Sequence, residues 1–297
     1  MILVVGSTGL VGLDICERLR RRGESVRALV RASSDPQKKE RLQAIGADLV
    51  EADLKRPDTL GKACEGVTAI VSTASATLSR QDGDTIETVD RDGQLALVDI
   101  AQSAGARRFV YISFRNNPDL QYPLRNAKTA VEERLRQPGI DYTILQASYF
   151  MEVWLSPALG FDYAGNQATV FGDGSNKLSW VSSGDVAAAA VACLFEPRTI
   201  RKTIEFGGPE ALSPLEVTSR FEKAGWGEFA LQHVPVEKLR ADYEAAEDPL
   251  QKTFAALQLQ YALGDPIDMS PALELLPLEL ASVDDYAARL RKQTPTA

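Results

Sequence analysis

The chain has 297 residues with a formal net charge of −8, and 44% of its residues are hydrophobic. This acidic balance argues against nucleic acid or an anionic membrane as the main partner, and the apolar content is enough for a large core. No apolar run approaches the ~20 residues of a membrane span, and no basic segment typical of a signal peptide precedes the first apolar run. The three cysteines are widely spaced without a CxxC motif, so we expect buried thiols, no metal site and a reducing cytoplasm.

The start of the chain predicts a strand, a glycine turn and a helix. Residues 1–5 form a short apolar run, residues 13–22 form an amphipathic run, and between them lies Gly6-Ser7-Thr8-Gly9-Leu10-Val11-Gly12. Glycines allow the backbone to turn tightly and to approach a phosphate, and the N-terminus of the following helix offers N–H groups to it. We therefore predict a dinucleotide site at this turn. A tight turn that binds nothing is the alternative.

Arg31 closes the second predicted strand, which covers residues 25–31. In dinucleotide-binding folds an acid at this place bonds the ribose 2′-hydroxyl of NAD, whereas an arginine suits the 2′-phosphate of NADP. Lys38 and Lys39 follow shortly after. We therefore expect NADP(H) to be preferred over NAD(H), with a solvated basic loop as the other interpretation.

Strands and helices alternate over the next hundred residues, which predicts an α/β fold: a Rossmann-type, doubly wound parallel sheet with helices on both faces. Thr73, Ala74 and Ser75 follow the fourth predicted strand, at the sheet edge where ligands lie in such folds. The alternation continues with a helix, a strand, a helix and a strand over residues 89–104, 108–113, 124–136 and 141–146.

We expect a division of the chain near residue 150. Residues 1–150 would form the NAD(P)-binding domain and residues 151–297 a smaller C-terminal α/β domain for a substrate or partner, with residues 180–206 returning to the first sheet. Tyr149, Phe150 and Trp154 begin an aromatic stretch that belongs either to the core or to a pocket wall.

Two further patterns concern the second half of the chain. Gly172-Asp173-Gly174 predicts a hairpin within residues 168–180. Residues 234–261 are expected to be mostly helical, and residues 213–216 carry the spacing of a capping box.

Several of these segments together resemble the NmrA-like atypical short-chain dehydrogenases/reductases over nearly the whole chain. The segments are VVGSTGLVG, VRALVR, ADL, RFVYIS, YPLRNAKTAVEERLRQPGIDYTILQASYFMEVW and WVSSGDVAAAAVACLFEP. The resemblance is nearest to the branches of the photosystem assembly factors and the NAD(P)H-dependent quinone or dye reductases. It implies a Rossmann domain that binds the nucleotide and a smaller C-terminal substrate domain.

The resemblance also implies roles for individual residues. Asp53 would accept a hydrogen bond from the adenine amino group with Leu54 beside the ring, although a helix cap is the other interpretation of Asp53. Ser113 stands where the superfamily keeps an active-site serine. Lys128 matches a lysine that the reductases retain, and it would bond the nicotinamide ribose and act as the acid. The alternative for Lys128 is an exposed helix lysine paired with Glu132.

The sequence departs from the superfamily at the Tyr-x-x-x-Lys pair, in which tyrosine donates a proton to the reduced carbonyl. Residue 124, four positions before Lys128, is leucine. A sugar-nucleotide epimerase is disfavoured, because epimerases of this superfamily rely on that pair.

Two hypotheses for the function remain. The first is an NADPH-dependent reductase that transfers hydride to a quinone, enone or similar small acceptor. The second is a regulatory or assembly protein that binds NAD(P)(H) without turnover and acts on a protein partner. For the reductase, the acceptor is expected beside Phe114, Tyr149, Phe150 and Trp154.

Overall fold

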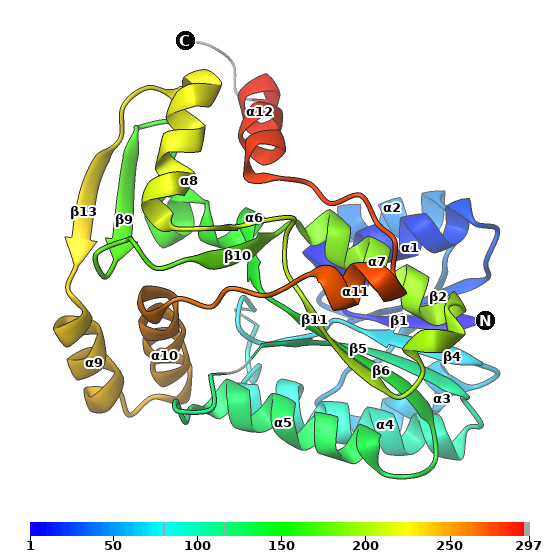
Figure 1. The fold of residues 1–297 in the computed structure, drawn as a ribbon. Helices are drawn as coiled ribbons and strands as arrows, with labels where there is room; N and C mark the ends of the chain where they lie inside the picture. Colours follow the sequence, from blue (N-terminus) through cyan, green and yellow to red (C-terminus); the bar gives the residue numbers. More distant parts are fainter. Residues whose placement is uncertain (80, 116, 294–297) are drawn as a thin grey trace. The chain divides into compact units, whose positions relative to one another are not determined.

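The computed structural model describes residues 1–79, 81–115 and 117–293 (Figure 1). The chain forms two compact units. Unit 1 consists of Met1–Phe114, Pro123–Gln146 and Val186–Ile204. Unit 2 consists of Arg115–Tyr122, Ala147–Asp185 and Glu205–Ala297. The chain therefore leaves unit 1 and returns to it twice.

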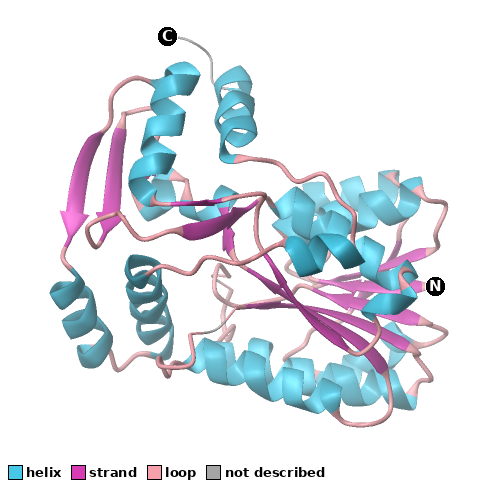
Figure 2. Ribbon diagram, viewed as in Figure 1, coloured by secondary structure: helices cyan, strands magenta, loops and turns pink. Residues whose placement is uncertain are grey.

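Unit 1 is built on a seven-stranded sheet with helices on both faces (Figures 1 and 2). The spatial order of the strands is β11 (Lys202–Phe206), β6 (Asp141–Ala147), β5 (Arg108–Phe114), β4 (Ala69–Ser72), β1 (Ile2–Val5), β2 (Val26–Val30) and β3 (Asp48–Glu51). The neighbours β1–β2, β2–β3, β1–β4 and β4–β5 pair in parallel. The predicted doubly wound sheet is confirmed.

The position of β1 explains its sequence. It lies between β2 and β4 and is buried along its whole length, so that both faces require apolar side chains. The strand order reverses between β1 and β4, and in doubly wound sheets ligands bind beside the C-terminal strand ends at this reversal. The segments that follow β1 and β4 are therefore the first place to look for a site.

The helical segments of unit 1 cover the two faces of this sheet. They are α1 (Leu10–Arg21), α2 (Pro36–Ala44), α3 (Leu60–Cys64), the π-helical segment η2 (Ile86–Gly93), α4 (Gln94–Ser103), α5 (Pro123–Arg136) and α7 (Ser183–Phe195), with short 3-10 turns η1 (Pro57–Thr59) and η4 (Pro197–Thr199). η2 runs directly into α4, so the helix predicted over residues 89–104 begins earlier and with a wider π turn. Such turns occur frequently at functional sites.

Unit 2 contains two small sheets and six helices among its described residues. One sheet has the order β12 (Ala211–Leu212), β10 (Leu178–Val181), β7 (Tyr149–Phe150), and the other β13 (Ala230–Val234), β9 (Gln167–Phe171), β8 (Phe161–Asp162). The helices are α6 (Met151–Trp154), α8 (Pro214–Phe221), α9 (Val236–Ala245), α10 (Pro249–Leu263), α11 (Ser270–Leu275) and α12 (Val283–Gln293), with short turns η3 (Pro157–Leu159) and η5 (Glu222–Trp226).

The hairpin predicted around residues 172–174 is wrong. β9 and β10 lie in different sheets, because β9 pairs with β8 and with the distant β13, while β10 pairs with β7 and β12. Gly172 and Gly174 do turn the chain, with φ angles of 82° and 79°. The local turn signal was correct, but the strand partners come from far along the chain.

Other local predictions for unit 2 are confirmed. Ser213 and Glu216 form the expected reciprocal capping box at the start of α8. The predicted helical stretch after residue 234 contains α9 and α10, which are separated where Asp248 caps α10 and Pro249 begins it. Within the described part of the chain, no helix combines the length and apolar character needed to cross a membrane.

Candidate functional site

The glycine turn after β1 packs so closely that side chains would not fit. A Cβ atom on Gly12 would lie 2.1 Å from the Gly6 carbonyl oxygen, and one on Gly6 would lie 2.6 Å from Thr73 Oγ1. Gly6 also has a φ angle of 82°, a conformation that glycine adopts readily. The turn thereby brings the start of α1 against the segment after β4.

The N-terminus of α1 has the features of an anion site. Gly9 provides no side-chain cap, and the first turn contains no acidic residue. The N–H groups of Leu10, Val11 and Gly12 lie in the first helical turn, where the helix itself supplies no acceptor. A pyrophosphate fits this end of the helix by charge and by hydrogen-bonding capacity.

Ser7 and Thr8 hold the turn in place. The Ser7 side chain is fully buried, and its hydroxyl donates to the Leu29 carbonyl of β2 at 2.6 Å. It therefore fixes the turn to the neighbouring strand and is not turned toward a ligand. The Thr8 carbonyl accepts a hydrogen bond from Lys38 Nζ at 2.9 Å, which brings this predicted cofactor residue to the glycine turn.

Arg31 follows β2 directly and is held by a carboxylate that the sequence did not indicate. Its Nη1 donates to Asp84 Oδ2 at 2.6 Å, and Lys55 Nζ lies 2.8 Å from Asp84 Oδ1. The Ser79 hydroxyl donates to the same carboxylate. The pKa of Asp84 lies below its usual value: burial alone would raise it, but the hydrogen bonds from Lys55, Ser79 and Arg31 outweigh that effect.

Asp53 and Leu54 make contacts within unit 1, and Arg56 rather than Asp53 occupies the N-cap position of η1. Asp53 Oδ1 accepts from the backbone N–H of Lys55 at 3.0 Å, and the Asp53 N–H donates to Thr59 Oγ1 at 3.0 Å. Leu54 is buried in the core of unit 1 and lies against Gly93. Their role beside adenine stays a prediction.

The segment after β4 is fixed by two polar residues of the η2–α4 helix. Asp90 Oδ2 accepts from the Ala76 N–H at 2.8 Å, and Gln94 Nε2 donates to the Ala74 carbonyl at 3.1 Å. Thr73 Oγ1 donates to the Val5 carbonyl at 3.2 Å, so this segment also joins β1.

Ser75 belongs to the same segment, and its hydroxyl lies 3.1 Å from that of Thr77. Sequence reasoning missed Asp90 and Gln94, although their spacing of four placed two polar side chains on the apolar face that continues with Leu97 and Ala101.

Lys128 is buried on α5, where that helix packs against η2. Its Nζ lies 3.6 Å from Asp90 Oδ1 and 4.8 Å from the ring centroid of Tyr111, and it donates to the Ile112 carbonyl at 3.3 Å. The alternative of an exposed lysine paired with Glu132 is wrong. Burial lowers the pKa of Lys128 below the usual lysine value, while the negative charges of Asp90 and Glu132 oppose the shift.

Ser113 and Glu132 form a hydrogen-bonded pair: Ser113 follows Ile112, whose carbonyl accepts from Lys128, and Glu132 lies four residues after Lys128 on α5. The buried Ser113 hydroxyl donates to Glu132 Oε1 at 2.6 Å. Glu132 also accepts from Gln146 Nε2 at 3.0 Å and from Arg136 at 2.9 Å. The Tyr111 hydroxyl is buried without a hydrogen-bond partner among the described residues, and burial raises its pKa.

The aromatic residues predicted for a pocket occupy two different units. Phe114 ends β5 in unit 1, whereas Tyr149, Phe150 and Trp154 belong to unit 2. Tyr149 is buried with its ring 5.0 Å from Trp154 and 5.9 Å from Tyr261, as in a packed aromatic core. The proposed contact of these four residues with an acceptor stays a prediction.

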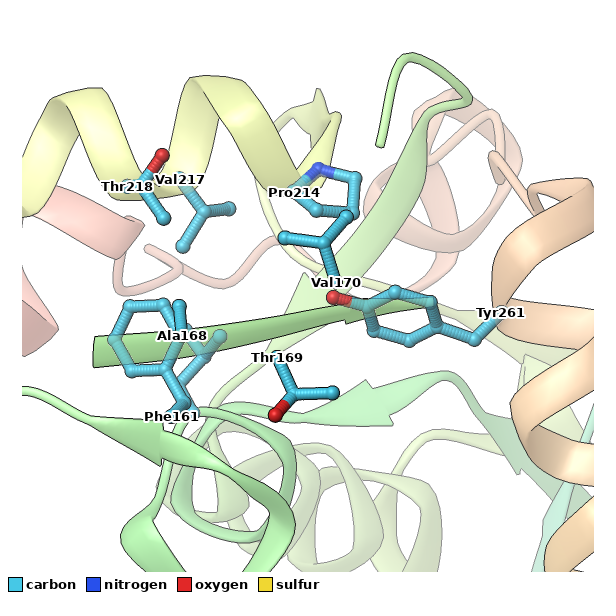
Figure 3. Close-up of a pocket in the computed structure, with 9 residues that line it drawn as sticks. Phe161, Ala168, Thr169, Val170, Pro214, Val217, Thr218 and Tyr261 are labelled. Atoms are coloured by element: carbon cyan, nitrogen blue, oxygen red, sulfur yellow. The ribbon is translucent and has the colours of Figure 1, made fainter. Parts of the chain in front are cut away.

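Figure 3 shows a small depression in unit 2 that is not suited to a substrate. Mostly apolar side chains of β8, β9, α8 and α10, together with Thr169 and Thr218, surround it, and it leaves no room for a water molecule. Phe161 lies on one side and Tyr261 on the other. We interpret it as a packing gap in the core of this unit.

Comparison with known proteins shows the family of this chain. The family model of the NmrA-like family matches residues 1–287. The chain belongs to the NmrA-like family. Photosystem II assembly factor Ycf39 of Synechocystis sp. is a relative with 32% identity over 243 residues, which cover 80% of this chain and 72% of that protein. The NAD(P)H azoreductase of Xenophilus azovorans is 27% identical over 278 residues, which cover 93% of this chain and 92% of that one.

Solved structures share the fold of this chain. The crystal structure of an NADPH-dependent quinone oxidoreductase from Escherichia coli, complexed with NADPH, has a TM-score of 0.77 and 21% identity to this chain. The match covers 98% of this chain and 100% of that one. At this level of identity the likeness establishes a shared fold.

Proposed function

We propose that the chain is an NADPH-dependent reductase that transfers hydride to a quinone, enone or similar small acceptor. The observation that carries this proposal is the buried Lys128, whose ammonium lies among Asp90, Tyr111 and the Ile112 carbonyl. Removing a lysine from water is costly, and a buried lysine with a lowered pKa is a candidate for proton transfer.

The residues around the glycine turn fit NADP(H). The N-terminus of α1 suits the pyrophosphate, and the glycines leave room for it. Arg31 and Lys38 supply positive charge for a 2′-phosphate, which favours NADP(H) over NAD(H). The E. coli relative was crystallised with NADPH. When bound, the nicotinamide supplies the hydride, and the protein orients it.

Lys128 has two roles in this proposal. It donates hydrogen bonds to the nicotinamide ribose, and it supplies a proton to the reduced acceptor. Its lowered pKa brings the ammonium closer to neutral pH, where a general acid works best. Asp90 orients the ammonium and holds the Ala76 N–H at the same time. A quinone accepts hydride readily, so the leucine at position 124 does not rule out this reaction.

A second function is supported by a different observation. The Synechocystis relative at 32% identity is an assembly factor, and this chain lacks the proton-donating tyrosine. A protein that binds NADP(H) without turnover would use the same glycine turn and act on a protein partner. The existence of such a partner and the cytoplasmic location stay predictions.

One assay separates the two functions. Purified protein is mixed with NADPH and a panel of quinones, enones, azo dyes and simple carbonyl compounds, and loss of NADPH absorbance is followed. A reductase shows turnover with at least one quinone or enone. Tight NADPH binding with no turnover over the panel supports the binding protein, and absence of any NADPH binding contradicts both.

A further inference from the structure

A buried carboxylate occupies the cationic end of the proposed nucleotide site. The Asp84 side chain is 1% exposed, whereas that of Arg31 is 27% exposed. Asp84 accepts from Arg31 Nη1 at 2.6 Å and faces Lys55 Nζ at 2.8 Å. The Ser79 hydroxyl donates to the same carboxylate. One carboxylate is therefore held by two cations and a hydroxyl.

This carboxylate comes from a different segment than the arginine. Arg31 follows β2, while Asp84 lies 53 positions later in the segment after β4. A hydrogen bond of 2.6 Å between Ser33 Oγ and Gln81 Oε1 joins the same two segments. The segment around Asp84 is thus fastened to the strand end at which dinucleotide folds distinguish the ribose 2′ substituents.

The chemistry of Asp84 matches that of a phosphate. Carboxylates and phosphates are both anionic acceptors that bind the same guanidinium N–H groups. The Nη1 N–H that donates to Asp84 is not available at the same time to a 2′-phosphate. We infer that Asp84 competes with the 2′-phosphate of NADP(H) for Arg31, and so limits how strongly the site prefers NADP(H) over NAD(H). This inference rests on the proposed NADP(H) site.

The competition acts on one cofactor only. NAD(H) has no 2′-phosphate, so its binding leaves the Arg31–Asp84 pair intact. NADP(H) has to take Arg31 from Asp84 or share it. Arg31 and Lys55 bring two positive charges to Asp84, and Asp53 Oδ2 lies 4.0 Å from the same Lys55 Nζ. Replacing the Asp84 carboxylate by an amide removes one negative charge from this group, which makes it more favourable for the incoming phosphate.

The test uses Asp84→Asn and two probes that contain only the adenosine end of the cofactors. Adenosine 2′,5′-bisphosphate carries the 2′-phosphate, and adenosine 5′-monophosphate lacks it. Titration calorimetry is expected to show that Asp84→Asn binds the bisphosphate about tenfold more tightly, the scale of one hydrogen bond between charged groups. Binding of the monophosphate should change by less than about twofold.

Two further variants show whether the effect is specific. Asp82→Asn removes the same charge from an exposed position in the same segment, and it should leave both affinities nearly unchanged. In an Arg31→Ala background, Asp84→Asn should no longer improve bisphosphate binding. If Asp84→Asn does not fold, as judged by circular dichroism, Ser79→Ala tests the same idea by removing one hydrogen bond to Asp84. It should give a smaller gain in the same direction.

Several results would overturn the inference. They are weaker bisphosphate binding by Asp84→Asn, equal changes for both probes, and an equal gain from Asp82→Asn. The proposed reductase function fails separately, when wild type binds the bisphosphate but does not oxidise NADPH with any acceptor. If wild type binds neither probe, the nucleotide site itself is wrong and the inference falls with it.

Discussion

Unit 1 contains two aspartate–cation pairs that differ in geometry and exposure. Asp90 is fully buried and lies 3.6 Å from Lys128 Nζ, and the lysine side chain is 6% exposed. Asp84 is also buried, but it hydrogen bonds to Arg31 at 2.6 Å, and the arginine side chain is 27% exposed. Both aspartates come after β4 in the chain: Asp84 lies in the segment before η2, and Asp90 lies in η2 itself.

The difference in exposure and pairing suits the two cations to different roles. Lys128 is removed from water and only loosely paired, so its pKa falls and its proton can be given up. Arg31 keeps contact with solvent, and a guanidinium stays charged at any ordinary pH. A buried lysine therefore suits proton transfer, whereas a half-buried arginine suits recognition of a fixed negative charge.

The largest expected effect comes from Lys128→Ala. It removes the proposed acid, so kcat should fall about a hundredfold or more, the usual scale for a positioned proton donor. Affinity for NADPH should fall much less. Steady-state kinetics with a quinone and NADPH titrations measure the two effects. Lys62→Ala, at an exposed lysine of α3, is the control. An unchanged kcat in Lys128→Ala would show that this lysine does not donate the proton, and the proposed difference in role between Lys128 and Arg31 would be wrong.

Arg31→Ala tests the other member of the comparison. It should weaken NADP(H) binding by about 1.5–3 kcal/mol, the scale of a hydrogen bond to a charged group, and barely change NAD(H) binding. Titration calorimetry with both cofactors gives the answer, and Arg56→Ala, which replaces an exposed arginine, is the control. Equal losses for NADP(H) and NAD(H) would mean that Arg31 does not read the 2′-phosphate.

Ser7→Ala tests the hydrogen bond that fixes the turn after β1 to β2, the strand that ends just before Arg31. It deletes the buried hydrogen bond to the Leu29 carbonyl, so the free energy of unfolding should fall by about 1 kcal/mol. Urea unfolding measures this change. Ser33→Ala, at an exposed serine, should have a smaller effect. Equal stability of Ser7→Ala and wild type would show that the turn does not depend on this bond.

The smallest expected effect is a shift of the pH profile in Asp90→Asn. Lys128 must be protonated to act as an acid, so kcat falls as the pH rises through its pKa. That pKa lies below the usual lysine value because of burial, and the Asp90 charge partly offsets the shift. Without that charge the fall in kcat should move toward lower pH. Asp92→Asn, an exposed position in η2, is the control, and coincident profiles for Asp90→Asn and wild type would contradict the pairing.

Local patterns in the sequence were sufficient for much of the fold. The apolar run before Gly6, the tight glycine spacing and the alternation of strands and helices predicted the sheet of unit 1, because each of these is a property of neighbouring residues. The same reasoning placed Arg31 at a strand end and Lys128 on a helix. It left open whether Lys128 was exposed, since burial depends on what packs over that helix.

Sequence patterns were enough to predict the order and type of the elements in unit 1, together with the glycine turn that marks the site. The partners could be read only from the folded chain: Asp84 beside Arg31, Asp90 beside Lys128, and β13 beside β9. These partners lie far apart along the chain. Periodicity and turn chemistry are set within a few residues, whereas charge pairs and strand partners join distant segments whose meeting depends on how the whole chain buries its apolar surface.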